Sequence, residues 1–239
     1  MGGTTLPGEA FLRANVPGFA LIDPEEPVKL PIEARDFGMY VGFLAVWAYL
    51  AVIGRGRAKG MPPPPILVTL ILFVGVMGFD GVNAFAFDLH KNVPLIPYLY
   101  EPRLQLRLAT GFLTGIAFAG ILAPVVNFSL WRVEDNRPIV ENWKQVLVAL
   151  AICAVLYVAN ESRLGILLYP LAIVTSASVP ILVGLINAVF LVSLVRKEGL
   201  AVTLFDALNP FAAGVFFALI ELGVLSLMRY AVLGTTILP

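Results

Sequence analysis

Six apolar runs, each of a length that can cross a lipid bilayer, constrain the fold of this chain more than any other feature. A transmembrane helix needs about 20 predominantly apolar residues, because the hydrocarbon core is about 30 Å thick and a helix rises about 1.5 Å per residue. Within the lipid only a helix or a closed barrel satisfies every backbone group, and runs of this length are typical of helices. The predicted fold is therefore an all-α, polytopic transmembrane helix bundle with about six spans, at residues 37–54, 66–87, 104–131, 144–160, 165–195 and 211–233.

The composition excludes several function classes. Hydrophobic residues make up 59% of the chain and charged residues 13%, which is typical of an integral membrane protein. The formal net charge of zero lacks the basic surplus of a nucleic-acid-binding protein. The single cysteine, Cys153, and the single histidine, His90, cannot form the clusters that bind zinc or haem. We therefore expect no cofactor and no nucleic-acid partner.

The spans divide the chain into four parts. Residues 1–36 form a polar, proline-rich arm, residues 37–131 and 144–239 each contain three spans, and residues 132–143 form a loop. The last run begins after Pro210, and residues 200–208 are expected to lie in the membrane interface. Cytoplasmic loops are enriched in Lys and Arg, and most of these residues fall on one face of a six-span arrangement. This pattern predicts a plasma-membrane protein with both termini outside the cytoplasm.

Three strings in the first half carry a family resemblance. They are Glu33-Ala-Arg-Asp-Phe-Gly-Met-Tyr-Val-Gly42, Phe79-Asp80-Gly81 and Arg107-Leu-Ala-Thr-Gly111. In order and spacing they resemble an uncharacterised family of bacterial polytopic membrane proteins, which reads Cys-x-Arg-Cys-x-Gly-x-Tyr-x-Gly, Asp-Gly and Arg-x-x-Thr-Gly. Glu33 and Asp36 stand where that family has its two cysteines, so the resemblance implies a fold core here and no thiol chemistry.

Glycine spacing in two of these strings predicts a close helix crossing. Gly38 and Gly42 are four residues apart in the first span, and Gly111 and Gly115 have the same spacing in the third. Small residues at this interval let two helices approach closely in lipid. We therefore expect the first and third spans to pack directly against each other.

Charged residues in the first three spans predict a polar cluster near the extracytoplasmic surface. Asp80 and Arg107 lie at similar depth in adjacent antiparallel helices, and pairing them removes the cost of a lone charge in lipid. The pair is interpreted either as a clamp that fixes helix register or as the floor of an outward cavity for a lipid headgroup, an anion or a proton. The residues expected to form this cluster are Arg35, Asp36, Tyr40, Asp80, Asn83 and Arg107.

Glu221 is expected close to the bilayer midplane, eleven residues after Pro210. An acid at that depth should face protein or water. It is interpreted either as a proton or cation site or as a neutral carboxyl group hydrogen-bonded to a polar residue of the fifth span. The candidates on that span are Thr175, Ser176, Ser178 and Asn187.

Three function classes remain. A scaffold or accessory subunit of a larger membrane complex, or a homo-oligomer, fits the few, peripheral charges and the absence of a catalytic motif. A small transporter or lipid-handling protein would use the Asp80/Arg107 cavity and Glu221. A membrane-embedded hydrolase would need a metal site, for which His90, Asp88, Glu33 and Asp36 are the candidate ligands. We further expect the N-terminal arm to cap the Asp80/Arg107 region.

Overall fold

The computed structural model describes residues 32–132, 135–162 and 164–233, and in them the chain forms six helices. The helices are α2 (Ala34–Val52), α3 (Pro64–Asn92), α4 (Leu104–Leu130), α5 (Trp143–Glu161), α6 (Gly165–Leu194) and α7 (Leu204–Leu233). Five of them, α3 to α7, are long and apolar enough to cross a membrane, whereas α2, which is as long as α5, begins with charged residues and is not among the five. The predicted polytopic helical membrane protein is confirmed. The expected N-terminal cap lies outside the described residues.

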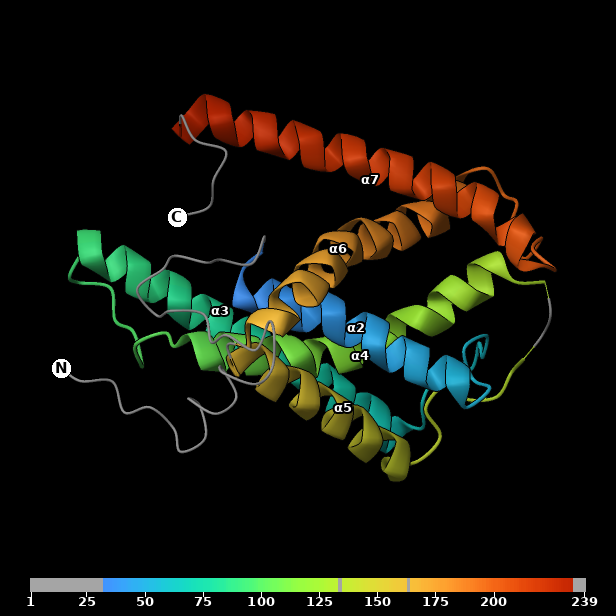
Figure 1. Cartoon of the computed structure of the whole chain (residues 1–239), viewed down its shortest axis with the longest axis horizontal. Coiled ribbons are helices and arrows are strands. Elements are labelled where there is room, and N and C mark those ends of the chain that lie inside the picture. Colours follow the sequence, from blue (N-terminus) through green and yellow to red (C-terminus); the bar gives the residue numbers. More distant parts are fainter. Residues whose placement is uncertain (1–31, 133–134, 163, 234–239) are drawn as a thin grey trace.

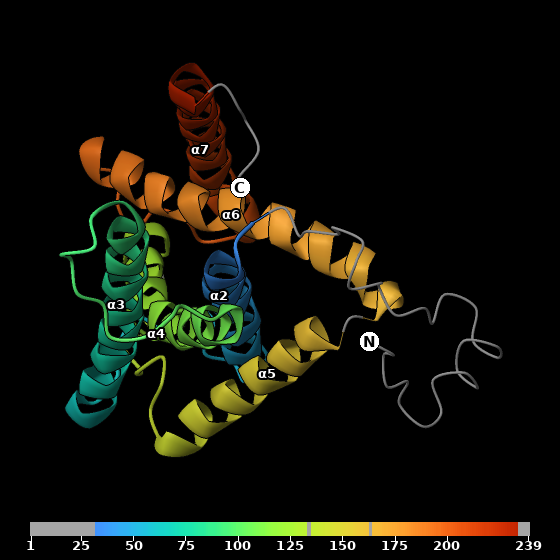
Figure 2. The ribbon, with the colours of Figure 1, turned by 90° about the vertical axis from the view of Figure 1, so that its left-hand side faces the viewer.

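The centre of the bundle is the pair formed by α2 and α4 (Figure 1, Figure 2). No other two described helices share so extensive a contact, and α3 packs against α4 on one side. The largest fully buried side chains come mainly from this pair and include Phe37, Phe43 and Leu108. An aromatic edge-to-face contact joins Phe37 to Phe112 across the pair, with ring centroids 5.9 Å apart.

The helices α6 and α7 form a second, looser unit. α6 crosses α2 and α4 and carries α7 on its far side, as Figure 1 shows. Pro170 and Pro180 both lie inside the continuous helix α6. α7 packs mainly against α6, and only 11% of its apolar stretch is buried, compared with 67% for α4. Most of α7 therefore faces the lipid in this chain.

The start of α7 differs from the sequence-based expectation. The helix begins at Leu204, and Pro210 lies inside it instead of opening it. The reason is a reciprocal N-terminal cap: the backbone N–H groups of Val202 and Thr203 donate to the Asp206 carboxylate, at 3.1 and 2.8 Å, and the Asp206 N–H donates to the Thr203 hydroxyl. Such a cap satisfies first-turn donors and fixes the helix start before the proline.

Candidate functional site

A buried ion pair with a third partner holds three parts of the chain together. Nη2 of Arg35, in the first turn of α2, lies 2.6 Å from Oδ2 of Asp80 in α3. The hydroxyl of Tyr100, in the loop before α4, donates to the other carboxylate oxygen at 2.7 Å. Asp80 is only 2% exposed and the Arg35 side chain 21%. We call these three residues the clamp.

The partner of Asp80 is a correction to the expected Asp80–Arg107 pair. The first turn of α2 brings the Arg35 guanidinium to the Asp80 carboxylate, beside Gly81 of α3, where a Cβ atom would lie at an ordinary contact distance of 3.4 Å from Nη1. Arg107 is partly buried and forms no ion pair within the described part of the chain, and its Nε is buried without a hydrogen-bond partner there.

Tyr100 remains a hydrogen-bond donor to the clamp across the physiological pH range. It lies in the loop between α3 and α4, outside the spans. Burial and the hydrogen bond to Asp80 raise the pKa of the Tyr100 phenol to about 12. The Tyr100 phenol is therefore protonated in the folded protein throughout this pH range.

Asn83 fixes the loop that carries Tyr100. Its side-chain oxygen accepts the Leu99 backbone N–H at 2.8 Å and the Tyr100 N–H at 3.4 Å, while its Nδ2 donates to the Tyr100 carbonyl at 2.8 Å. The amide thus satisfies backbone groups of a loop that has no secondary structure of its own. Asn83 therefore holds the backbone of Tyr100 in place and is not itself a member of the clamp.

The four glycines of the first and third spans lie where α2 and α4 meet. A Cβ atom on Gly38 would lie 2.6 Å from the Leu108 carbonyl oxygen, and one on Gly111 would lie 2.2 Å from the Arg35 carbonyl oxygen. A Cβ on Gly115 would lie 2.8 Å from the Phe43 nitrogen, and one on Gly42 would lie 3.0 Å from the Phe112 ring. The backbones can approach this closely only because these positions lack side chains.

Two members of the expected cluster stay apart from the clamp. Asp36 and Tyr40 are partly buried on α2, and neither forms a hydrogen bond or ion pair within the described residues. Glu221 lies far along the chain, on α7, where its carboxylate accepts a hydrogen bond from Nδ2 of Asn187 at 3.1 Å. Thr175 and Ser178 instead donate to carbonyl groups of their own helix, α6.

The candidate metal ligands do not converge. Within the described residues, no group of three or more His, Cys, Asp or Glu side chains is placed to hold a metal ion. Nδ1 of His90 lies 2.7 Å from the carbonyl oxygen of Ile96, and Asp88 pairs with Lys91 one turn further along α3. These contacts stabilise the end of α3 and the loop that follows.

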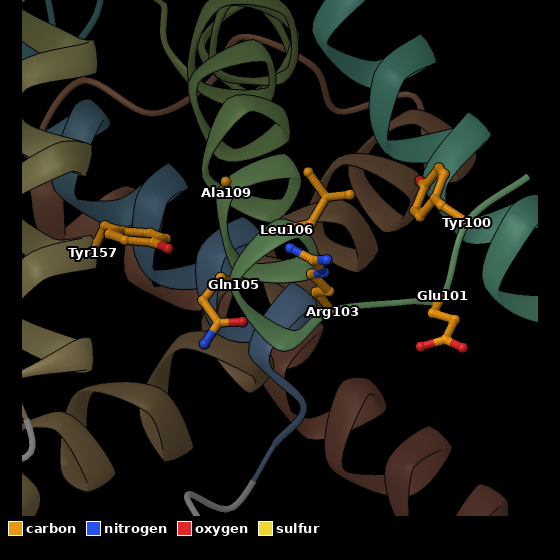
Figure 3. A pocket seen from close by; sticks show the side chains of 7 residues that line it. All are labelled: Tyr100, Glu101, Arg103, Gln105, Leu106, Ala109 and Tyr157. Atoms are coloured by element: carbon orange, nitrogen blue, oxygen red, sulfur yellow. The ribbon is translucent and has the colours of Figure 1, made fainter.

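A cavity of about 650 Å³ opens beside the clamp, at the beginning of α4. Figure 3 shows Arg103 and Gln105 between Tyr157, which comes from α5, and Glu101, which comes from the loop. Tyr100 contributes to both places, because its ring lines the cavity while its hydroxyl bonds to Asp80. Leu106 and Ala109 form the apolar part of the lining. We call this space the loop cavity.

The opposite end of the bundle is closed by hydrogen bonds between loops. We call the loops 53–63, 131–142 and 195–203 together the laced end. The backbone N–H groups of Lys59 and Gly60 donate to the carbonyls of Asp135 and Arg137, at 2.8 and 3.1 Å. The backbone N–H of Arg132 donates to the Ala201 carbonyl at 2.8 Å, which joins the third loop.

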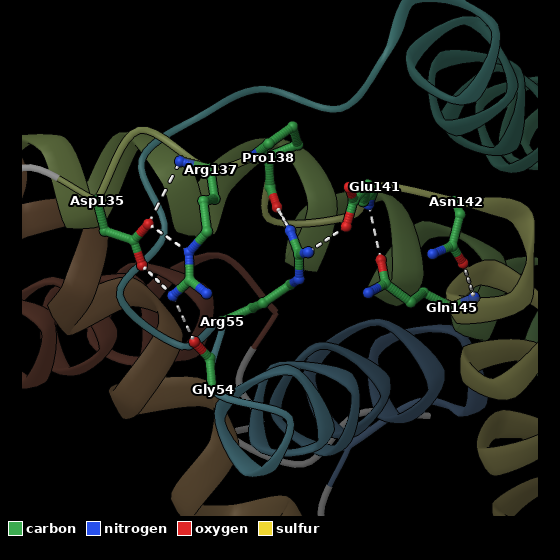
Figure 4. A network of polar contacts seen from close by, with 8 residues as sticks. All are labelled: Gly54, Arg55, Asp135, Arg137, Pro138, Glu141, Asn142 and Gln145. Carbon is green, nitrogen blue, oxygen red and sulfur yellow. Dashed lines mark hydrogen bonds and ion pairs between the residues drawn. The ribbon is translucent and has the colours of Figure 1, made fainter.

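Side chains strengthen the laced end (Figure 4). Arg55 binds the Pro138 carbonyl and the Glu141 carboxylate, and Arg137 pairs with Asp135 at 2.8 Å and donates to the Gly54 carbonyl. The hydrogen bond from Arg137 holds the pKa of Asp135 below its usual value. Several of the cations at this end therefore hold loops together.

Comparison with known proteins identifies a family for the clamp region. The model of the family described as "Predicted membrane protein (DUF2085)" matches residues 26–121. This confirms the resemblance inferred from the three strings, and the matched part contains α2, α3 and most of α4. No curated protein and no solved structure matches the chain. The matched residues are less than half of the chain, and the description of that family states no function beyond a membrane location.

The sequence reasoning missed most of the residues that line the loop cavity. Tyr100, Gln105 and Tyr157 were not among the candidate site residues. One signal was available in the sequence, because Glu101 and Arg103 are charged residues that flank Pro102 at the start of a membrane span. The contribution of Tyr157 depends on how α5 packs and has no local signature.

Proposed function

We propose that this protein is a non-catalytic scaffold or accessory subunit of a larger complex in the bacterial plasma membrane, and that α7 is the helix that docks the partner. The clamp and the glycine crossing give α2, α3 and α4 a fixed core. α7 extends from this core with α6 as its main neighbour among the described helices. The partner would be another membrane protein whose helix lies along α7.

The observation that carries the proposal is the position of Glu221. The centre of α7 falls between residues 218 and 219, so Glu221 lies about 4 Å from the middle of the helix along its axis. Its side chain is exposed and receives one hydrogen bond, from Asn187. A charge at the bilayer centre costs about 3 kcal/mol on insertion scales. A partner helix with a hydrogen-bond donor at the same depth would remove that cost.

The test is purification from native membranes in lipid nanodiscs, followed by mass measurement and photo-crosslinking from position 224 of α7. We expect stoichiometric capture of a membrane protein by wild type, and loss of it by Glu221→Leu. Glu221→Gln should keep the partner, because the amide retains hydrogen bonding. Gly78→Ala on α3, where a Cβ meets open space, is the matched control. A chain that purifies alone, or a partner retained by Glu221→Leu, contradicts the proposal.

The proposed orientation places the laced end in the cytoplasm and both termini outside. Its support is the concentration of Lys and Arg in the loops of that end, following the positive-inside rule. Cysteines introduced at Arg57 and Lys91 in otherwise cysteine-free protein should label from opposite sides of intact cells. Equal accessibility of both positions contradicts this orientation.

Transport through the bundle is the weaker alternative. Both carboxylate oxygens of Asp80 already accept hydrogen bonds inside the protein, which supports the interpretation of the clamp as structural. The observation that favours lipid handling is the loop cavity, which lies beside the clamp. Uptake of a solute by reconstituted vesicles that is abolished by Asp80→Asn, in protein that remains folded, would favour transport over the scaffold.

A further inference from the structure

The polar groups of the loop cavity lack partners inside the protein. Arg103, Gln105 and Tyr157 form no side-chain hydrogen bond or ion pair within the described residues, although the three side chains line one space. Glu101, which lines the same space, likewise forms no ion pair with Arg103. By contrast, the Tyr100 hydroxyl is bound to Asp80. The free groups of the cavity are therefore available to a ligand.

The charges of the loop cavity balance. Arg103 supplies one positive charge and Glu101 one negative charge, and the other lining residues are neutral. A free phosphate dianion would meet this carboxylate as well as the guanidinium. A ligand that carries both a phosphate and an ammonium group matches both charges, because each ligand charge then has an opposite partner.

The cavity lies at the beginning of α4, a helix long and apolar enough to cross a membrane, and the ends of such helices meet the headgroup region. Arg103 immediately precedes α4, and the apolar residues Leu106 and Ala109 lie one to two turns further along the helix. Arg and Tyr at such positions commonly anchor a protein to the membrane interface. The first turn of α4 has no side-chain cap, so backbone N–H groups there can add to a phosphate site.

We propose that the loop cavity binds the headgroup of a zwitterionic phospholipid such as phosphatidylethanolamine. The phosphodiester binds to Arg103 and Gln105, and the ammonium group binds to Glu101. The Tyr157 hydroxyl donates to an ester oxygen of the glycerol, and one acyl chain lies along Leu106 and Ala109. This site lies beside the clamp and is independent of α7, so it goes beyond the scaffold function.

The test is native mass spectrometry of the full chain with phosphatidylethanolamine and phosphatidylglycerol of identical acyl chains. We expect wild type to retain phosphatidylethanolamine at least tenfold more strongly than phosphatidylglycerol. Arg103→Gln should lower retention of phosphatidylethanolamine at least tenfold, because one charge-assisted contact is lost. Glu101→Gln should abolish the preference between the two lipids. Water-soluble glycerophosphoethanolamine and inorganic phosphate distinguish an intact lipid from a free headgroup or phosphate.

Controls keep the lipid site separable from the fold and from the docking of a partner. Lys144→Gln, an exposed charge change in the first turn of α5, should leave lipid retention unchanged. Arg103→Lys keeps the charge and should retain part of the binding, which separates lost affinity from lost folding. Equal retention of both lipids by wild type, or full retention by Arg103→Gln, overturns the proposal, as does preference for inorganic phosphate. Partner capture, measured in the same samples, should be unaffected by either cavity variant.

Discussion

The α2–α4 crossing and the α6–α7 crossing use the same local device with different results. At the first, a Cβ on Gly111 would lie 2.2 Å from the Arg35 carbonyl oxygen; at the second, a Cβ on Gly214 would lie 2.1 Å from the Gly184 carbonyl oxygen. Yet α4 also packs against α3, α5 and α6, whereas α7 packs mainly against α6. Close approach at one glycine therefore does not make a helix part of the core.

The two regions differ in the number of neighbouring elements that pack against each helix. α4 is surrounded, and the clamp ties the beginning of α2 to α3 and to the loop before α4. α7 packs mainly against α6, and Asn187 of α6 donates to its Glu221 carboxylate and its Gly214 carbonyl. The first region is expected to determine the stability of the chain, and the second its association with other molecules.

The largest effect should follow the removal of the acid of the clamp. Asp80→Ala leaves the partly buried Arg35 without its counter-charge, and breaking a buried pair from one side costs about 3–5 kcal/mol. Unfolding in mixed micelles would measure this loss. Glu221→Ala, in the other region, should not destabilise the isolated chain, because it removes a costly charge together with one hydrogen bond from Asn187. Equal effects of the two variants would remove the distinction between the regions.

A double-mutant cycle sharpens the assignment of the partner of Asp80. Coupling of Asp80→Asn with Arg35→Gln should be about 1–3 kcal/mol, because the two groups are in contact. Coupling of the same change with Arg107→Gln should be much smaller. Larger coupling to Arg107 would restore the pairing expected from the sequence.

Next in size is the effect of adding one methyl group at each crossing. Gly111→Ala should destabilise the whole chain by about 1–3 kcal/mol, because the backbone of α2 must move away. Gly214→Ala should weaken only the packing of α7 against α6. Hydrogen exchange should then be faster in α7, with little change in α2 to α4. Gly223→Ala meets open space and serves as the control. Global unfolding at the same denaturant concentration for Gly111→Ala and Gly223→Ala would contradict this prediction.

An effect of similar size is expected from the phenol of the clamp. Tyr100→Phe removes one hydrogen bond to a charged group and should cost about 1.5–3 kcal/mol at neutral pH. The pKa of Tyr100 is raised to about 12, so its contribution is complete below the unfolded value of about 10 and is lost as pH rises through 12. Wild type should therefore lose stability between about pH 10 and 12, and Tyr100→Phe should lack this component.

The smallest effect concerns the laced end in acid. The pKa of Asp135 is lowered by its hydrogen bond from Arg137, so its contribution is present above the unfolded value of about 3.9 and is lost as pH falls further. Asp135→Asn should make the stability slightly less sensitive to acid below about pH 4. Exposed pairs contribute little, so a large change would mean that this loop contact is more important than its exposure suggests.

Sequence reasoning placed the helices well and the side-chain partners less well. Except at the start of α7, run length and polar boundaries locate the spans to within a few residues, but they give the depth of a residue and not the direction in which its side chain points. Arg35 and Arg107 both lie near the same end of the bundle, and depth alone does not decide which of them reaches Asp80. Thr203 and Asp206 carried a readable helix-start signal, and the more prominent Pro210 obscured it.

The laced end also imposes an order in time on the formation of the structure. Lys59 donates to the carbonyl of Asp135, which is synthesised 76 residues later. At a synthesis rate of about 5–20 residues per second, Asp135 is added about 4–15 s after Lys59. The Gly56 and Ala58 carbonyls likewise gain their partner only when Asn127 has been synthesised, and the third loop of the laced end, which contains Ala201, follows last. A ribosome pause or a truncation before residue 135 would therefore leave α2 and α3 inserted with an unsatisfied loop, which is the form that a membrane protease or chaperone would meet first.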